Sequence, residues 1–231
     1  MNATMPARFA HRCAAWSLDA VVPGLATMAL CWPRLSAGAT RMTQALDQLS
    51  AALARAMDAM MMGTLTPLEL TRAWVADPAQ RAAVEALSDA IGALLMPPLL
   101  VFPLLALAWF VGFEASSRQA TPGKRLLGLR VVDVDGRGIG LLRAVQRHLA
   151  GTLSWLTLNI GHLLAALPPQ RLALHDRIAG TRVVQVAGTG ALPGWARAWL
   201  GLLAVASVGA LAWLFVVASA AMQRAFEAML Y

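Results

Sequence analysis

The chain has 231 residues, of which 58% are hydrophobic and 13% are charged. A soluble domain carries roughly 25% charged residues, so this composition indicates an integral membrane protein. The formal net charge is +7, but the basic residues are spread over polar segments between apolar runs. This distribution favours anchoring at the anionic cytoplasmic face of a membrane over binding of nucleic acid. Cys13 and Cys31 lie 18 positions apart on one predicted helix, about 27 Å at helical rise, which excludes a disulfide between them.

The first long apolar segment runs from Arg12 to Pro33 and contains an aspartate, Asp19. Roughly twenty helical residues cross a hydrocarbon core about 30 Å thick, so residues 1–35 are predicted to form a cytoplasmic N-terminus and a first span. The apolar region is longer than the roughly 7 to 15 residues of a cleaved signal peptide, so we expect the span to be retained. A carboxylate at the centre of a membrane helix costs roughly 2.5 to 3.5 kcal/mol, and Asp19 therefore requires a partner.

Residues 36–90 are predicted to form a helical insert outside the membrane. Apolar residues at steps of three and four give one face of an amphipathic helix: Met42, Leu46, Leu49, Leu53, Met57, Met60 and Met61. Prolines after Thr66 and Asp77 indicate two further helix starts, because proline is favoured at the first helical position. A second span is expected over residues 91–113 and a last span over residues 198–222.

Residues 114–148 form a basic polar connector with the features of a small folded segment. Thr121-Pro122 is typical of a helix start. The β-branched sequence LRVVDV from Leu129, ended by a turn at Asp135-Gly136, predicts a short strand. The similar sequence TRVVQV from Thr181 predicts a second strand, and the two are expected to pair as a ribbon. Gly123-Lys124 lacks the upstream glycine and the following Ser or Thr of a phosphate-binding loop, which excludes that nucleotide site.

Basic residues also predict the orientation of the chain. The connector carries seven basic and three acidic residues, whereas residues 34–90 carry five basic and six acidic residues. The N-terminus and the connector are therefore expected in the cytoplasm and the insert outside. A complete crossing by the third apolar run, residues 149–167, would place four arginines outside against this rule: Arg171, Arg177, Arg182 and Arg197. We therefore favour a hairpin within residues 149–187, broken near Asn159 to Gly161, over a full span.

The predicted fold class is an all-α polytopic membrane protein. It is a helical bundle of three clear spans plus one re-entrant or tilted apolar hairpin, with a small cytoplasmic β-ribbon.

Polar residues in the apolar runs are the candidate functional residues. Asp19 either fixes the docking of the first span on the hairpin or exchanges a proton or cation, as buried carboxyl groups can. Asn159 and His162 are the strongly polar residues inside the third apolar run, and we expect them to meet Asp19. Asp176 is expected to cap a short helix or to pair with an arginine such as Arg130 or Arg12.

Three blocks of sequence resemble the RDD family of bacterial membrane proteins. They read R-x-x-A-x-x-x-D, ATPGK-x-x-x-GLRVV and HDR-x-AGT-x-VV, and they begin at Arg12, Ala120 and His175. The blocks follow the family's order over about residues 8–187. The arginine and the two aspartates that give the family its name correspond to Arg12, Asp19 and Asp176. The insert is longer than the family's usual outer loop, and the last span lies beyond its core.

This resemblance implies a membrane protein for which transport, including cation/proton exchange, has been proposed. The leading hypothesis is an RDD-type protein of the bacterial inner membrane that moves a small cation or another solute through a polar centre: Arg12, Asp19, Asn159, His162, His175 and Asp176. The alternative is a non-transporting scaffold or assembly factor that binds a membrane partner, or a second copy of the chain, through the insert.

No catalytic role is expected, because no nucleophile, base and orienting group occur together in the sequence. His148, His162 and His175 lack the spacing of a helical metal pair, so we expect no metal and no cofactor. The expected partners are the lipid bilayer, a small cation or solute and a membrane protein, but no nucleic acid.

Overall fold

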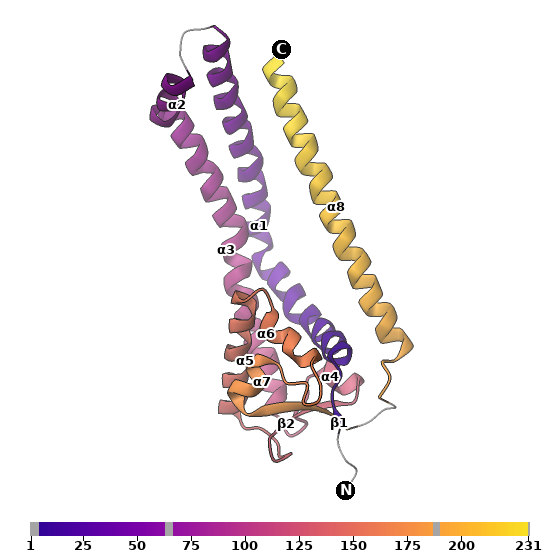
Figure 1. The fold of residues 1–231 in the computed structure, drawn as a ribbon. Coiled ribbons are helices and arrows are strands. Elements are labelled where there is room, and N and C mark those ends of the chain that lie inside the picture. The colour runs from indigo at the N-terminus through magenta and orange to yellow at the C-terminus, as the bar shows by residue number, and fades with distance from the viewer. Residues whose placement is uncertain (1–4, 63–66, 187–189, 231) are drawn as a thin grey trace. The chain divides into compact units, whose positions relative to one another are not determined.

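The computed structural model describes residues 5–62, 67–186 and 190–230. Three long helices each contain a segment long and apolar enough to cross a membrane (Figure 1): α1 (Phe9–Met61), α3 (Pro78–Glu114) and α8 (Gly194–Leu230). The shorter helices are α2 (Pro67–Ala76), α4 (Pro122–Leu126), α5 (Leu141–Leu156), α6 (Ile160–Leu163), η1 (Leu164–Ala166) and α7 (Leu174–Ala179). The strands are β1 (Met5–Pro6), β2 (Leu129–Asp133) and β3 (Thr181–Gln185). The predicted fold class, a helical membrane protein with a small sheet, is confirmed.

The chain divides into two compact units. Unit 1 consists of Met1–Thr27 and Phe102–Val205, and unit 2 consists of Met28–Val101 and Ala206–Tyr231. The divisions fall within the long helices, because α1, α3 and α8 each contribute to both units.

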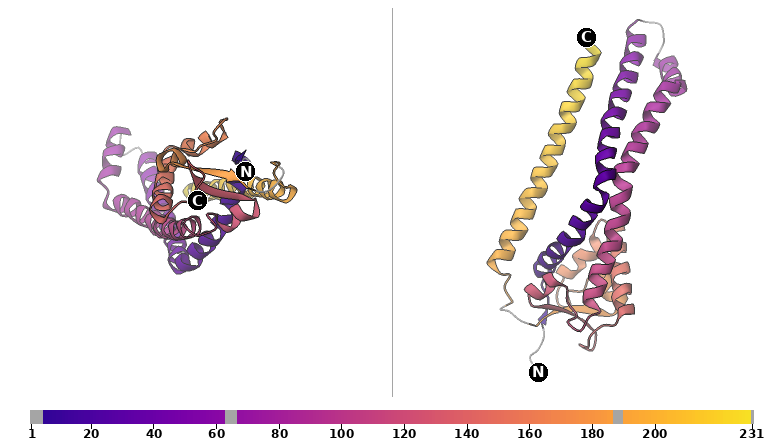
Figure 2. Two further views of the ribbon diagram at one scale, coloured as in Figure 1. Left: turned by 90° about the horizontal axis from the view of Figure 1, so that it is seen from below. Right: turned by 180° about the vertical axis from the view of Figure 1, so that it is seen from behind.

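In unit 2 the boundary predicted at residue 35 is not an end of helix. Helix α1 continues unbroken to Met61, about 80 Å at helical rise, and lies beside α3 in the views of Figures 1 and 2. Helix α2 begins at Pro67 and α3 at Pro78, as predicted, and the Asp77 carboxylate accepts a hydrogen bond of 2.9 Å from the Ala79 N–H. Thr66 lies outside the described residues.

A seam of small residues brings α1 and α3 together. Buried residues recur every seven positions in α1, at Cys31, Gly38, Ala45 and Ala52, and in α3, at Ala83 and Ala90. Seven-residue spacing keeps side chains on one face of a helix, and small side chains let two helix backbones approach closely. A Cβ on Gly38 would lie 3.0 Å from Leu94 Cδ2, so the approach is tight.

The predicted Met/Leu stripe flanks this seam rather than forming it. Met42, Leu49 and Leu53 are half-buried, whereas Leu46 and Met57 are each 42% exposed. The prediction was based on the hydrophobicity of the side chains, whereas the close packing of two helices depends on the size of the side chains. The Met60 side chain lies outside the described residues.

In unit 1 the predicted ribbon is present, and it is larger than expected. Strands β2 and β3 pair antiparallel with Val131 opposite Val183, and β1 adds to the other edge of β3 to give the order β1-β3-β2. The Ala7 N–H extends this pairing with a hydrogen bond of 3.0 Å to the Val183 carbonyl. Strand β1 has two residues, too few for an alternating pattern to reveal it.

The third apolar run forms the expected hairpin. Helix α5 and the α6–η1 segment are bent by 116° relative to each other, and the reversal uses left-handed backbone at Leu158 and Asn159. Strands β2 and β3 belong to one sheet, so the segment between them leaves this sheet and returns to it. Gly161 allows α6 to approach α5, because a Cβ there would overlap Ser154 Oγ.

A compact apolar core holds these pieces of unit 1 together. It contains small residues of α1 (Ala14, Ala15), strand residues (Leu129, Val131, Val183) and Ala196 of α8, all buried. The Trp199 indole N–H also donates to Ser17 Oγ at 3.0 Å, which joins the start of α8 to α1.

Candidate functional site: a buried ion-pair network

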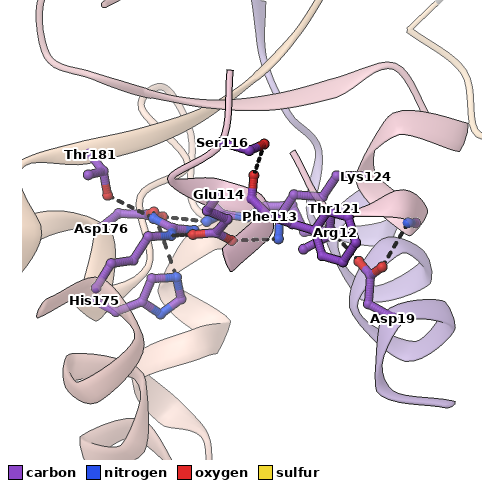
Figure 3. Close-up of polar contacts among 12 residues, drawn as sticks. Arg12, Asp19, Phe113, Glu114, Ser116, Thr121, Lys124, His175, Asp176 and Thr181 are labelled. Atoms are coloured by element: carbon purple, nitrogen blue, oxygen red, sulfur yellow. Dashed lines mark hydrogen bonds and ion pairs between the residues drawn. The ribbon is translucent and has the colours of Figure 1, made fainter. Parts of the chain in front are cut away.

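Asp19 of α1 caps the short helix α4. Its carboxylate accepts a hydrogen bond of 2.8 Å from the Gly123 N–H and another from the Thr121 hydroxyl (Figure 3). Thr121 is the N-cap of α4, so the carboxylate lies where unpaired N–H groups and the helix dipole favour a negative charge. A Cβ on Gly123 would lie 2.5 Å from the Ala15 carbonyl oxygen, so glycine is needed for this approach.

The prediction that Asp19 meets Asn159 and His162 is wrong. Asn159 is exposed at the bend of the hairpin, where its carbonyl accepts hydrogen bonds from the His162 N–H at 3.0 Å and the Leu163 N–H at 3.1 Å. Hydrophobicity placed Asp19 and Asn159 at membrane depth, but it carries no information about which neighbour the polar face of α1 contacts.

Asp176 of α7 lies between two arginines. Arg12 of α1 contacts one carboxylate oxygen at 2.5 Å, and Arg147 of α5 contacts the other. The first oxygen also accepts a hydrogen bond of 2.8 Å from the Ala173 N–H at the start of α7. Both roles expected for Asp176, helix capping and pairing with Arg12, are therefore present. The other suggested partner, Arg130, is exposed on β2.

Arg147 extends these contacts into a network. Its Nε lies 3.1 Å from a Glu114 oxygen, and the other Glu114 oxygen lies 2.7 Å from Lys124 Nζ. The result is an alternating series of charges, named the ion-pair network below: Lys124, Glu114, Arg147, Asp176 and Arg12. The series joins α1, the end of α3, α4, α5 and α7 (Figure 3).

Further hydrogen bonds fix the arginines of the network. Arg147 donates to Thr181 Oγ1 at 2.8 Å, and Arg12 donates to the Arg171 carbonyl at 2.8 Å. The side chains of Arg147 and Asp176 are almost completely buried, with exposed fractions of 6% and 0%. A charge so far removed from water is stable only when it is paired and hydrogen-bonded, as both are here.

Sequence reasoning missed three members of the network. Glu114, Lys124 and Arg147 contributed to the charge count of the connector, where each basic residue was interpreted as an anchor at the membrane surface. Arg143 and Arg147 lie one turn apart on α5, yet Arg143 is exposed and Arg147 is buried. The available signal was the position of Lys124 inside the ATPGK block.

His175 and His162 lie beside the network. Their ring centroids are 5.2 Å apart, and His175 Nε2 is 3.7 Å from an Asp176 oxygen. Neither Nδ1 atom has a hydrogen-bond partner among the described residues. His175 lies on α7, outside the candidate membrane spans. Burial, reinforced by Arg147, holds the pKa of His175 well below its usual range, so its imidazole is neutral near pH 7.

Asp176 is ionised throughout the physiological range. Burial by itself would raise the pKa of its carboxyl group, but the positive charges of Arg147 and Arg12 outweigh burial and hold that pKa well below its usual range.

In the described part of the chain, no group of three or more His, Cys, Asp or Glu side chains is arranged to hold a metal ion.

The RDD family profile matches residues 6–180, more than half of the chain. The chain is also similar to the uncharacterized protein YxaI of Bacillus subtilis (strain 168), with 33% identity over 89 residues. That similarity covers 38% of this chain and 58% of the relative, which is less than two thirds of the relative's length. No solved structure matches the chain. The extent of the profile match, which includes Arg12, Asp19 and Asp176, shows that the chain belongs to the RDD family.

Proposed function

We propose that this protein is a scaffold or assembly factor of the bacterial inner membrane, and that the ion-pair network is a permanent lock within it. One observation carries the proposal: all six carboxylate oxygens of Asp19, Glu114 and Asp176 already accept contacts from side chains or backbone N–H groups. A passing cation would have to compete with these donors at every oxygen of the three carboxylates.

Energetics support a permanent lock over a path for cations. Breaking a buried ion pair by removing one partner costs roughly 3 to 5 kcal/mol, and a passing cation would have to displace a guanidinium or an ammonium group in this way. The network also combines three cationic side chains with two carboxylates. Its excess positive charge opposes the entry of a further cation.

In this proposal the lock keeps the N-terminus, the connector and the hairpin in one fixed arrangement at the cytoplasmic face. The helices of the insert carry the surface for a membrane partner. Large apolar side chains exposed there support this assignment: Met61, Leu68, Val75 and Val84. No catalytic step is assigned to the protein.

Flux measurements in liposomes test the proposal. Vesicles that contain the wild-type protein should show no cation-driven change of internal pH above that of protein-free vesicles. A matched Asp19→Asn variant should behave identically. A cation-driven change in wild-type vesicles that disappears in folded Asp19→Asn protein would contradict the lock.

A deletion tests the role of the insert. A variant that lacks residues 40–88 should keep the thermal unfolding transition of unit 1, because the network lies entirely outside the deleted segment. The same variant should lose a crosslinked membrane partner that the wild-type chain retains. Retention of that partner would exclude the insert as its binding surface.

One observation favours proton-coupled transport as a second candidate. His162 and His175 are adjacent, and each has an unpartnered Nδ1 among the described residues. Histidine side chains serve as proton shuttles, and a proton can pass between two imidazoles that lie this close together. If the protein moves protons, His175→Asn should abolish the flux and Asp19→Asn should not, provided that both variants are folded.

A further inference from the structure

A second site lies in unit 1, apart from the ion-pair network. Helices α1 and α3 line an open groove with a volume of about 720 Å³. Its apolar walls come from Val22, Pro23 and Ala26 of α1 and from Leu105, Ala108 and Gly112 of α3. The walls contain no residue of the network, so the two sites can be tested independently. The name α1–α3 groove is used for this open groove below.

We propose that the α1–α3 groove binds an anionic phospholipid, with an acyl chain along the apolar walls and the phosphate at Arg118. The residues of both walls belong to helices long and apolar enough to cross a membrane. The groove is therefore accessible to the acyl chains of the surrounding bilayer. In the bilayer this surface is surrounded by lipid, and the groove provides a shaped binding site for one lipid molecule.

Aromatic side chains complete the wall on α3. Trp109 and Phe113 both line the groove, and their rings pack edge to face with centroids 4.8 Å apart. Aromatic pairs in this geometry are rigid and present a large apolar area. Tryptophan is also enriched at the level of the lipid headgroups, where the groove passes from its apolar walls to its polar mouth.

The mouth of the groove matches an anionic headgroup. Ser117 and Arg118 line it directly after α3 ends at Glu114, and both are exposed. No lining residue is acidic. Within the described residues, Arg118 forms no ion pair, so its guanidinium is available to a phosphate. Arginine is suited to this role because its planar fork binds two phosphate oxygens at once.

The dimensions of the groove fit one chain of a lipid. Small-molecule sites commonly enclose roughly 300 to 1,000 Å³, which includes this volume. Gly112 keeps part of the space free, since a Cβ built on it meets no atom within 4 Å. Free inorganic phosphate would use only the mouth and would leave the apolar walls unoccupied, so the complete groove favours a lipid.

Native mass spectrometry of the full-length protein in detergent tests the proposal. The probes are phosphatidylglycerol and phosphatidylcholine with identical acyl chains. The wild-type protein should retain one phosphatidylglycerol molecule more tightly than phosphatidylcholine. Arg118→Gln should weaken phosphatidylglycerol binding by roughly tenfold or more, as expected from the loss of a charged hydrogen-bond donor. Gly112→Leu should weaken binding of both lipids, because the new side chain takes up part of the groove that an acyl chain would occupy.

Two matched variants serve as controls. Arg125→Gln removes another exposed arginine of the connector, and Gly92→Leu adds the same side chain to α3 at a glycine that also has open space around it. Neither residue lines the groove, so both variants should bind phosphatidylglycerol like the wild type. If Gly112→Leu does not fold, Ala108→Leu tests the same wall.

Three outcomes would overturn the proposal. The first is unchanged lipid retention in a folded Gly112→Leu or Ala108→Leu variant. The second is equal loss of lipid in the Arg125→Gln and Arg118→Gln variants. The third is displacement of the bound lipid by millimolar inorganic phosphate, which would place recognition at the mouth alone.

Discussion

Asp19 and Asp176 have different surroundings although both are fully buried aspartates. Asp19 receives a hydroxyl and a backbone N–H, whereas Asp176 receives two guanidinium groups and a backbone N–H. Asp19 therefore joins α1 to a helix start, and Asp176 joins α1 to α5 and α7. Of the three residues that name the family, Arg12 and Asp176 are in contact with each other, and Asp19 belongs to a neighbouring contact.

Arg147→Met should destabilise the protein strongly. The substitution preserves an unbranched side chain but leaves Asp176 and Glu114 without a shared cation, at a cost of about 3 to 5 kcal/mol in the free energy of unfolding. Thermal unfolding in detergent micelles measures this cost. The control is Arg143→Met, one turn earlier on α5. Arg143 is 46% exposed and pairs with Asp133 at 3.3 Å, so its loss should cost less than about 1 kcal/mol. Equal effects of the two variants would contradict the network.

His175 should make the protein less stable in mild acid. The imidazole remains neutral in the folded state because burial and Arg147 lower its pKa, whereas the unfolded imidazole takes up a proton near pH 6.5. The unfolded state then binds more protons, so stability falls as pH decreases below about 6.5, by up to about 1.4 kcal/mol per pH unit. The charged and titratable groups around His175 are Arg147, Asp176, Arg12 and His162.

The His175→Asn variant isolates this effect. Its unfolding temperature should change less than that of the wild type between pH 7 and pH 5. Asp176 adds little in this window: burial alone would raise its pKa, but Arg147 and Arg12 lower it well below the usual range. The stabilisation from Asp176 is therefore complete above about pH 4 and is lost only in stronger acid. Identical pH profiles for the variant and the wild type would exclude His175 as the cause.

At the scale of elements, α4 depends on close contact with α1. The two helices come closest at Gly123, where the backbone of α4 lies against the Ala15 carbonyl and the Asp19 carboxylate. Its five residues bury few side chains of their own, since Gly123 and Lys124 are the buried ones. The position of α4 is therefore determined by Asp19 capping and by the Lys124–Glu114 pair rather than by an apolar face.

Gly123→Ala should destabilise this contact. The added methyl group would lie 2.5 Å from a backbone oxygen and 2.9 Å from an Asp19 oxygen, and such overpacking costs about 1 to 3 kcal/mol. Gly151→Ala is the matched control on α5, where the nearest atom would lie 4.0 Å away. That change should instead stabilise the protein by about 0.5 to 1 kcal/mol, because alanine favours a helix interior. Chemical unfolding followed by circular dichroism distinguishes the two signs, and stabilisation by Gly123→Ala would contradict the close approach.

At the scale of the whole molecule, the charge distribution predicts a cytoplasmic connector and an external insert. Single cysteines test this orientation in a background with Cys13→Ala and Cys31→Ala. Leu68→Cys and Asp135→Cys place a thiol at exposed positions of the insert and the connector. In intact spheroplasts, a membrane-impermeant maleimide should label Leu68→Cys and should label Asp135→Cys only after permeabilisation. The reverse pattern would invert the proposed orientation.

Local signals in the sequence were sufficient for much of the architecture. Apolar runs predicted the three spans, prolines predicted the starts of α2, α3 and α4, and β-branched repeats predicted the pairing of β2 with β3. Each of these features depends on neighbours along the chain or on hydrophobicity, which a sequence records directly. The break near Asn159 was also predictable, because charge placement disfavoured a full crossing.

The tertiary structure decided which charges are buried and what they contact. Arg143 and Arg147 are chemically identical and lie one turn apart on α5. Arg147 pairs with Asp176 because it lies on the face of α5 that packs against α7, whereas Arg143 pairs with Asp133. Asp19 contacts α4, which lies about a hundred residues away in sequence, rather than the polar residues of the hairpin. The energy of a buried ion pair depends on distance and desolvation in three dimensions. The sequence therefore determined a membrane protein of the RDD type, and the fold determined which of its charges are buried in the ion-pair network.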